Sequence, residues 1–379
     1  MITVGAVGDL ILDEPDPEFF LAPAAPVLRG MDLAIGHVEV PHSTTAVQHS
    51  TDVPAPPADP AALKAVAEAG FAVVTLAGNH ICDAGDGGLA DTIAYSRAAG
   101  LRTAGAGPDL ARARRPAIVQ RGGLRIGVLS YNCVGPRDSW ATSRKPGCAY
   151  VHVLTHYELD HASPGGPPKV YTFADPDSLE AMAADVRRLR AEADVVLVSL
   201  HKGVGHTPVV VAMYESPVAR AAVDAGADAV FSHHPHIMRG IEVYKGRPIF
   251  HGLGNFVTVT HALTPGADTG ADELRAWAER RTRLYGFTPD PDMPFFPFHP
   301  ESRNTAIAFC RFDETGLHEA GFVPCRIDDH GRPVPVGGTP EGEAVAKYVE
   351  DITHGARLNG RFTSRGGEVL VDLSEGGSA

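Results

Sequence analysis

The chain is poor in cysteine, lacks an excess of basic residues and has no long apolar run. Its five cysteines are scattered and include no C-x-x-C pair, which favours buried thiols in a reducing compartment over a disulfide framework. The formal net charge of −13 argues against a nucleic-acid partner, because phosphate binding needs a basic face. No apolar run approaches the roughly 18 residues that a membrane span requires. These absences exclude a membrane or nucleic-acid partner from our expectations.

Composition and length favour one large globular domain. Hydrophobic residues make up 44% and charged residues 21% of the 379 residues. Ile2–Val7 has the pattern of a buried strand and not of a leader segment, so we expect a cytoplasmic protein. We interpret residues 1–363 as a single domain with insertions at 137–177 and 261–303, and residues 364–379 as a mobile tail. The second insertion is rich in aromatic residues, and we expect it to face the substrate.

Short apolar runs alternate with stretches of helical character, a pattern typical of an α/β protein. The predicted buried strands are Ile2–Val7, Leu33–Gly36, Ala72–Leu76, Arg125–Ser130, Val195–Leu200, Ala229–Ser232 and Pro248–His251. The predicted helices are Pro60–Ala69, Gly87–Ala99, Ser178–Glu192, Ser216–Ala225 and, inside the second insertion, Ala271–Arg281. The later runs Asn304–Asp313 and Gly321–Arg326 have no helix between them, which predicts antiparallel strands.

Residues with metal-ligand chemistry follow one predicted strand after another. They are Asp9, Glu39, Asn79 with His80, His201, His234 with His236, and Asn255. In α/β folds ligands bind at the carboxyl ends of the strands. Carboxylates, an amide and imidazoles together suit a transition metal or a mixed nitrogen and oxygen site. Taken alone, Asp9 could cap a helix, and His201 could be a hydrogen-bonded histidine of the core. Ligand-type residues at six strand ends in succession predict a metal site instead.

In their order along the chain these motifs resemble those of CapA-like proteins, the poly-γ-glutamate capsule synthesis branch of the calcineurin-like metallophosphoesterases. The motifs are Gly8-Asp9, Gly36-His-Val-Glu39, Asn79-His80-x-x-Asp83, His201-x-Gly203, His234-Pro-His236 and Gly254-Asn255. The resemblance runs from Ile2 to about Val257. It implies a four-layer αββα sandwich of two packed sheets flanked by helices, with the metal site at the C-terminal ends of the strands.

The resemblance also implies the roles of individual residues. Two metal groups would share one carboxylate, with Asp9, Glu39 and His236 at the first ion and Glu39, Asn79, His201 and His234 at the second. His80 would be a proton donor beside the metals, oriented by Asp83, while His37 and Asn255 would support the ligands. The ions would be divalent, with manganese, zinc, iron and calcium all open, and no organic cofactor is expected.

The sequence departs from the usual motifs at several of these positions. Ile11 stands where the superfamily has a histidine ligand, and His37 stands where the CapA branch has asparagine. The residues after His201 lack the tryptophan and glutamate that the branch usually carries. The first metal therefore loses a ligand, and a function transferred by family name alone is unsafe.

We therefore hold several functions open, all with a peptide as the expected partner. The first is Cα epimerisation of a ribosomal peptide of the lasso type by 1,1-proton transfer, with Asp9, His80 and His299 as candidate acid and base groups. The second is metal-dependent hydrolysis of a phosphoester or an amide. The others are an accessory role in poly-γ-glutamate synthesis and metal binding without turnover.

Overall fold

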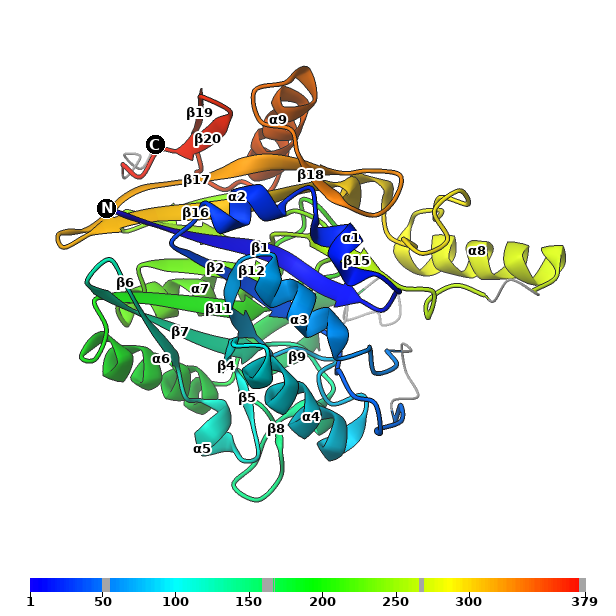
Figure 1. Ribbon diagram of the computed structural model, residues 1–379, viewed down its shortest axis with the longest axis horizontal. Coiled ribbons are helices and arrows are strands. Elements are labelled where there is room, and N and C mark those ends of the chain that lie inside the picture. The colour runs from blue at the N-terminus through cyan, green and yellow to red at the C-terminus, as the bar shows by residue number, and fades with distance from the viewer. Residues whose placement is uncertain (50–54, 159–165, 167, 266–268, 375–379) are drawn as a thin grey trace.

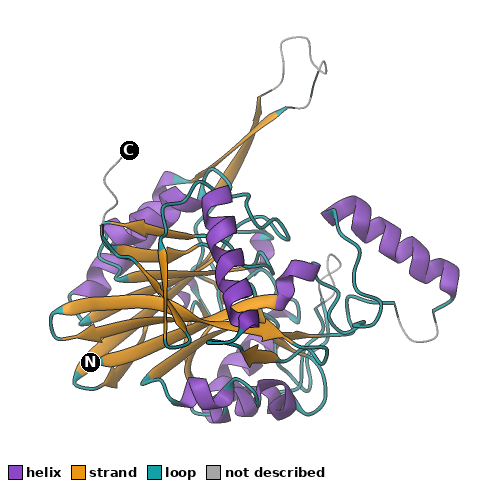
Figure 2. Cartoon of the chain, turned by 90° about the horizontal axis from the view of Figure 1, so that it is seen from above, coloured by secondary structure: helices purple, strands orange, loops and turns teal. Residues whose placement is uncertain are grey.

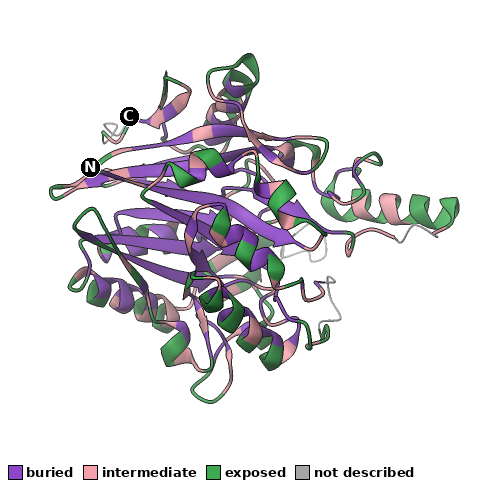
Figure 3. Cartoon of the chain, viewed as in Figure 1, coloured by how far each residue is buried: buried purple, intermediate pink, exposed green. Residues whose placement is uncertain are grey.

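The computed structural model describes residues 1–49, 55–158, 166, 168–265 and 269–374 (Figure 1). Its centre is formed by two β-sheets that pack face to face. Helices cover the outer face of each sheet, as the view from above shows (Figure 2). In the burial view the central strands of both sheets are almost continuously buried, whereas the helices expose their outer sides (Figure 3).

The larger sheet has ten strands in the described part of the chain. Their bounds are β1 Ile2–Leu12, β2 Leu33–Val38, β3 Phe71–Thr75, β4 Arg102–Ala104, β15 Asn255–Val259, β16 Asn304–Asp313, β17 Gly316–Ile327, β18 Pro333–Pro335, β19 Phe362–Arg365 and β20 Glu368–Val371. The order is β19-β20-β17-β16-β1-β2-β3-β4, with β15 also beside β1 and β18 beside β17. The strands β1, β2, β3, β4 and β15 run parallel, and β16 begins the antiparallel half.

The smaller sheet has six described strands in the order β13-β14-β12-β11-β7-β6. Their bounds are β6 Ala117–Arg121, β7 Leu124–Asn132, β11 Val195–His201, β12 Ala229–His233, β13 Ile241–Tyr244 and β14 Arg247–Phe250. Its central strands β7, β11, β12 and β14 are parallel. Two separate strand pairs complete the described strands, namely β5 Ala106–Gly107 with β8 Gly147–Cys148, and β9 Val153–Glu158 with β10 Lys169–Ala174.

Three apolar clusters define four layers. Between the sheets, Val4 and Ile35 of the larger sheet pack with Leu197 of the smaller sheet. On the outer face of the larger sheet, Leu63 belongs to a cluster beneath the helices α1 Pro17–Leu21, α2 Ala25–Arg29, α3 Ala61–Glu68 and α4 Gly85–Ala98. On the outer face of the smaller sheet, Met182 belongs to a cluster beneath α5 Leu110–Ala113, α6 Pro176–Arg190 and α7 Glu215–Asp224. The predicted αββα sandwich is therefore confirmed.

Two further helices lie outside this pattern. The helix α9 (Pro340–Gly355) contributes Val349 and Ile352 to the core between the sheets. The helix α8 (Ala271–Tyr285) has no buried residue and projects from the body on the right of Figure 1. None of the described helices combines the length and the hydropathy needed to cross a membrane.

The predicted strands and helices are confirmed, with some changes. The helix predicted over Ala271–Arg281 continues to Tyr285. Residues 364–371, which we assigned to a mobile tail, instead form the end of β19 and all of β20, and β20 pairs with β17. That assignment is wrong for these residues, because alternate side chains of β20, Val369 and Val371, reach the core. Residues 375–379 lie outside the described part.

Candidate metal centre and adjoining pocket

The predicted ligands meet at one edge of the sandwich, where the strands that carry them end. From the larger sheet come Asp9, which lies inside β1 three residues before its end, and Glu39, Asn79 and His80, which follow β2 and β3. From the smaller sheet, at or after the ends of β11 and β12, come His201, His234 and His236. His233 Nε2 lies 3.0 Å from the carbonyl oxygen of Val7, which ties the two sheets together beside this edge.

The strand β1 changes face just before Asp9. Val4 and Ala6 face the core between the sheets, whereas Leu10 and Leu12 face the outer helices. The pairing of β1 with β2 shifts register between Ala6 and Asp9, and a shift of this kind re-aims the side chains that follow. Asp9 is consequently turned inwards and fully buried.

The first predicted metal group is assembled in the structure. One ligand atom from each of Asp9, Glu39 and His236 lies within 4.8 Å of the others. His236 Nε2 is 3.4 Å from Glu39 Oε1, and His236 Nδ1 is 3.5 Å from Asp9 Oδ2. Asn255 Oδ1 accepts a hydrogen bond from His236 Nδ1 at 2.9 Å, which places the amide beside the ring, and its role in supporting that ligand stays a prediction.

The second predicted group is assembled as well. Ligand atoms of Glu39, His201 and His234 lie within 4.8 Å of one another. Asn79 Oδ1 is 2.7 Å from His201 Nε2, which places the amide beside the same group. His234 and His236 have positive φ angles of 92° and 54°, conformations that non-glycine residues rarely adopt and that concentrate at functional sites.

A third group includes His37, which we had given only a supporting role. Ligand atoms of Asp9, His37 and His201 also lie within 4.8 Å of one another. The Nδ1 of His37 is 3.0 Å from the Thr75 hydroxyl, which leaves Nε2 for another partner. His37 therefore offers a nitrogen near Asp9, in a site where Ile11 has replaced a histidine.

The donor set fits a bound divalent ion. Buried polar atoms nearly always have a hydrogen-bond partner. Here several buried atoms have none: Glu39 Oε1 and Oε2, His37 Nε2, His201 Nδ1 and His234 Nδ1. Carboxylate oxygens and imidazole nitrogens left unpaired at one place are the atoms that a transition metal binds. The pattern fits divalent metal ions without identifying which.

The charge states in the metal-free protein follow from burial and from neighbouring charges. Burial and the Glu39 carboxylate raise the pKa of Asp9 well above its ordinary value. Burial alone would raise the pKa of Glu39, but the His236 imidazolium outweighs it and brings that pKa to about 2. Burial lowers the pKa of His234 to about 3. Burial also lowers the pKa of His201. Neutral imidazoles are the form that binds metal.

His80 and Asp83 form a tight pair at the rim of the metal group. His80 Nδ1 is 2.7 Å from Asp83 Oδ2, as predicted for a proton donor held by a carboxylate. Burial lowers the pKa of His80, but the hydrogen bond to Asp83 and the charge of Glu39 raise it more, so the net shift is upward. The second ring nitrogen of His80 is left to contact a ligand.

A cavity of about 220 Å³ opens on this edge. From the metal group it is lined by Glu39, Asn79, His80, His234 and His236. The second insertion supplies the opposite wall with Leu263, Arg281, Tyr285 and Phe298. The insertion therefore contributes side chains to the cavity beside the metal group, and its role in facing a substrate stays a prediction.

Arg281 is a partly buried cation in this wall, and sequence reasoning missed it. Its guanidinium carbon lies over the rings of Trp277, Tyr285 and Phe287, at 5.7, 5.1 and 5.9 Å from their centroids. Its Nη2 donates to the carbonyl of Pro297, but its Nε is buried without a partner. The helical pattern of α8 gives no sign of this, because arginines on helices normally face solvent.

Asp13 is a second lining residue that the sequence analysis overlooked. Burial raises its pKa to about 6, against a hydrogen bond from the Thr260 hydroxyl at 3.0 Å. A carboxyl group with this pKa exchanges protons near neutral pH. Its position directly after β1 is the signal that would have found it, because Asp13 follows Leu12, the last residue of that strand.

The structure does not bring His299 to the cavity wall. Its Nδ1 accepts a hydrogen bond from the backbone N–H of Glu301 at 3.1 Å, at the start of a short 3₁₀ helix (Pro300–Arg303). Its ring packs edge-on against Phe287, 5.2 Å away between centroids. This placement gives no geometric support to His299 as an acid or base.

Directly behind His201 lies a second buried cluster of charges. Lys202 Nζ is 2.9 Å from Glu215 Oε2 and 3.0 Å from His251 Nδ1. His251 Nε2 is in turn 2.9 Å from Glu242 Oε2. Lys202 and Glu215 are fully buried. We refer to Lys202, Glu215, His251 and Glu242 as the ion network.

Comparison with known proteins places the chain in a family. The sequence profile described as bacterial capsule synthesis protein PGA_cap matches residues 3–260. The chain belongs to the PGA_cap family. This confirms the resemblance to CapA-like proteins, and the matched range contains each predicted metal ligand.

Relatives in the PGA_cap family are named for polymer synthesis. The chain is 33% identical over 197 residues to the capsule biosynthesis protein CapA of Bacillus anthracis, covering 52% of this chain and 42% of that protein. It is 34% identical over 192 residues to a "probable polyglutamine synthesis accessory protein" of Mycobacterium tuberculosis, covering 49% and 44%. The chain thus spans less than half of the length of these two relatives.

Among solved structures, the calcineurin-like phosphoesterase YfkN of Bacillus subtilis aligns with 94% of this chain and 97% of its own chain. The TM-score is 0.38 and the sequence identity 13%, a similarity on which we base no argument.

Proposed function

We propose that the chain is a metal-dependent enzyme that inverts the Cα configuration of a residue at the carboxyl end of a peptide. The observation that carries the proposal is one small cavity lined by two acid–base side chains, Asp13 and His80, together with metal ligands. Epimerisation needs one group to remove the Cα proton and another to return a proton to the opposite face. The cytoplasmic location expected from the sequence remains a prediction.

The candidate ligands that face the cavity are Glu39, Asn79, His234 and His236. A divalent ion bound by them would supply a Lewis acid that polarises a carboxylate or carbonyl of the peptide and so acidifies the adjacent Cα proton. The donor set leaves manganese, zinc, iron and calcium open.

The protein's own residues would perform the remaining steps. Arg281, with its unpartnered Nε, would bind the carboxylate of the peptide, and Tyr285 and Phe298 would pack on its side chain. Asp13 would take the Cα proton while the electron pair of the broken C–H bond moves into the polarised carbonyl. His80, oriented by Asp83, would then donate a proton from the other side and restore a C–H bond of opposite configuration.

Two observations favour alternatives. The His80–Asp83 pair, at 2.7 Å, also suits a general acid that protonates the leaving group of a phosphoester or amide. The names of the relatives favour a glutamate polymer as the substrate of an accessory protein in its synthesis. Both alternatives use the same metal group, so they differ from our proposal in the bond that is broken.

Solvent deuterium distinguishes these functions. Purified protein with added manganese, zinc or calcium is incubated in D₂O with peptides ending in a free carboxylate and with the same peptides amidated. We expect one deuterium at the terminal Cα, a mixture of configurations on chiral analysis, and loss of both in Asp13→Asn and Glu39→Gln. Cleavage of the peptide or of p-nitrophenyl phosphate without Cα labelling would replace this proposal with a hydrolase.

A further inference from the structure

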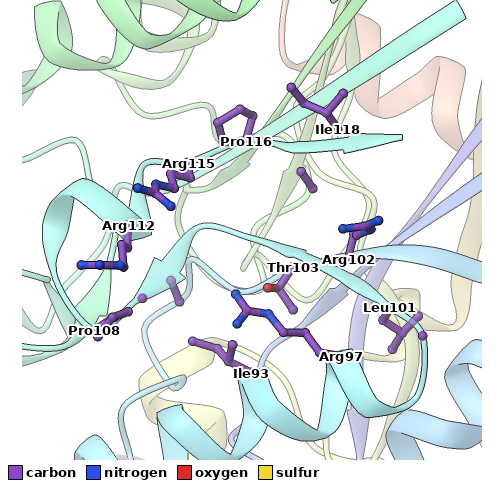
Figure 4. Close-up of a pocket in the computed structure, with 14 residues that line it drawn as sticks. Ile93, Arg97, Leu101, Arg102, Thr103, Pro108, Arg112, Arg115, Pro116 and Ile118 are labelled. Atoms are coloured by element: carbon purple, nitrogen blue, oxygen red, sulfur yellow. The ribbon is translucent and has the colours of Figure 1, made fainter. Parts of the chain in front are cut away.

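A second and larger concave surface lies at the lateral edge of the sandwich. Its volume is about 780 Å³, and it is formed by α4, β4, the segment around α5 and the start of β6 (Figure 4). Arg102 on β4 is level with Val73 in the middle of β3, whereas the metal ligand Asn79 follows the carboxyl end of β3. The linings of this groove and of the catalytic cavity share no residue among those described. We call it the arginine groove.

Four arginines line the arginine groove, and no aspartate or glutamate does among the described residues. They are Arg97, Arg102, Arg112 and Arg115, and all four are exposed. Arg112 is neutralised by Asp109, 2.5 Å away. The side chains of the other three have no hydrogen-bond or ion-pair partner in the described part of the chain. A chain with a net charge of −13 thus concentrates unpaired positive charge at one place, which attracts anions.

The arginine groove also contains two free sheet edges. In the described part of the chain β4 pairs only with β3, and β6 pairs only with β7. Edge strands present unpaired backbone N–H and C=O groups, on which an extended peptide can form main-chain hydrogen bonds. Pro116, Ala117 and Ile118 bring the beginning of β6 into the groove lining.

We propose that the arginine groove binds an extended acidic peptide segment. Its carboxylates would pair with Arg97, Arg102 and Arg115, and its backbone would lie along the edge of β6. Figure 4 shows Arg112 and Arg115 on the left and Arg97 and Arg102 further right, so the charges are spread along the groove. A volume of about 780 Å³ exceeds what a single small anion fills, and spaced guanidinium groups suit several carboxylates in succession.

The test is a binding titration with a fluorescein-labelled peptide of about ten residues that alternates Glu and Thr, long enough to run along an edge strand. Fluorescence anisotropy is measured with the full chain, and a peptide with Lys in place of Glu serves as the sign control. The charge-reversal pair Arg97→Glu/Arg115→Glu is compared with Lys169→Glu/Arg357→Glu, which changes two exposed cations elsewhere by the same total charge. Circular dichroism melting confirms that both variants fold.

We expect the acidic peptide to bind, the lysine peptide not to bind, and Arg97→Glu/Arg115→Glu to raise the Kd by about tenfold or more. Lys169→Glu/Arg357→Glu should leave the Kd within about twofold, and added salt should weaken binding of the unaltered chain. The proposal is overturned by equal loss in both variants, by displacement with inorganic phosphate at the same charge concentration, or by an unaltered chain that does not bind the acidic peptide. None of these readings depends on the catalytic cavity.

Discussion

Two clusters of buried charged side chains stand next to each other in this fold, and they differ in how their charges are satisfied. In the ion network Lys202 contacts both Glu215 and His251, and His251 contacts Glu242. In the metal group both oxygens of Glu39 are buried without a hydrogen-bond partner. Buried charges that hydrogen-bond to one another hold structure together, whereas buried carboxylate oxygens without a hydrogen bond, here with the His236 ring 3.4 Å from Glu39 Oε1, indicate a missing ligand. The contrast identifies the metal group more firmly than the residue types alone.

The largest expected effect is on the ion network. We expect Lys202→Met to lower the free energy of unfolding by about 3–5 kcal/mol, because it leaves buried Glu215 with only the more distant Arg239, whose Nη1 is 3.9 Å from Glu215 Oε1. Urea unfolding measures this, and Lys202→Met/Glu215→Leu should recover only part of the loss, since it leaves buried Arg239 without that carboxylate. Lys347→Met breaks an exposed ion pair with Asp351 and should cost less than about 1 kcal/mol. Equal losses in Lys202→Met and Lys347→Met would remove the contrast between the two clusters.

Removing metal should affect the other cluster next most strongly. With a divalent ion at about a hundred times its Kd, the free energy of unfolding should rise by about 2.7 kcal/mol over the chelated protein. Thermal and urea unfolding with EDTA, manganese, zinc or calcium measure the shift. Glu39→Gln should show none, because it removes the carboxylate shared by both metal groups. The same stability with and without every ion would refute the assignment.

The His80–Asp83 pair tests whether an imidazole that is hydrogen-bonded to a carboxylate can still act as a proton donor in catalysis. We expect Asp83→Asn to lower the rate of Cα deuterium incorporation by about 10–100-fold, since it loosens the orientation of His80. Metal content by elemental analysis and the unfolding midpoint should stay as in the unaltered chain. A loss of metal along with the rate would make Asp83 part of the metal group instead.

The smallest expected effect concerns Asp13, which is half-buried with one hydrogen-bond partner, Thr260, and so is intermediate between the two clusters. Its pKa of about 6 lies above the ordinary 3.8, so the folded state holds its proton more tightly than the unfolded state. Stability should therefore fall as pH rises from about 4 to about 6 and level off above that. Asp13→Asn should remove this pH dependence. It amounts to a change of about 1 kcal/mol in the free energy of unfolding, after allowing for the partial exposure of Asp13. If the dependence of stability on pH were the same in Asp13→Asn, a group other than Asp13 would be responsible for it.

The parts of the site that could be predicted from the sequence are those in which a ligand-type residue follows an apolar run. Asp9, Glu39 and His201 each follow an apolar run, so the parallel order of strands was enough to expect them at one edge. Asp13 follows the same rule, because it comes directly after β1, but the strand predicted from the sequence, Ile2–Val7, ends well before it. His37 has the residue type of a ligand, yet its position inside β2 concealed that its ring reaches Asp9.

Other features depend on contacts between distant segments and could not be predicted. Lys202 and Glu215 are ordinary residues in the sequence, and only folding places them 2.9 Å apart. Arg281 lies on a helix with no buried residue, so its place in the cavity wall depends on how that helix docks. The strand β20 is short and surrounded by glycines, a pattern that favours a mobile tail. Its order comes from pairing with β17, a distant segment of the chain.

The cavity has two walls with different origins along the chain. The metal ligands come from many strand ends within residues 3–260, the range shared with the PGA_cap family. The facing side chains Arg281, Tyr285 and Phe298 come from one continuous segment that begins after that range. One wall of the cavity can therefore be exchanged as a single continuous segment without altering any of the proposed metal ligands. If the proposed function holds, replacing residues 261–303 with the corresponding segment of a homologue should change which peptide is accepted while metal binding is retained.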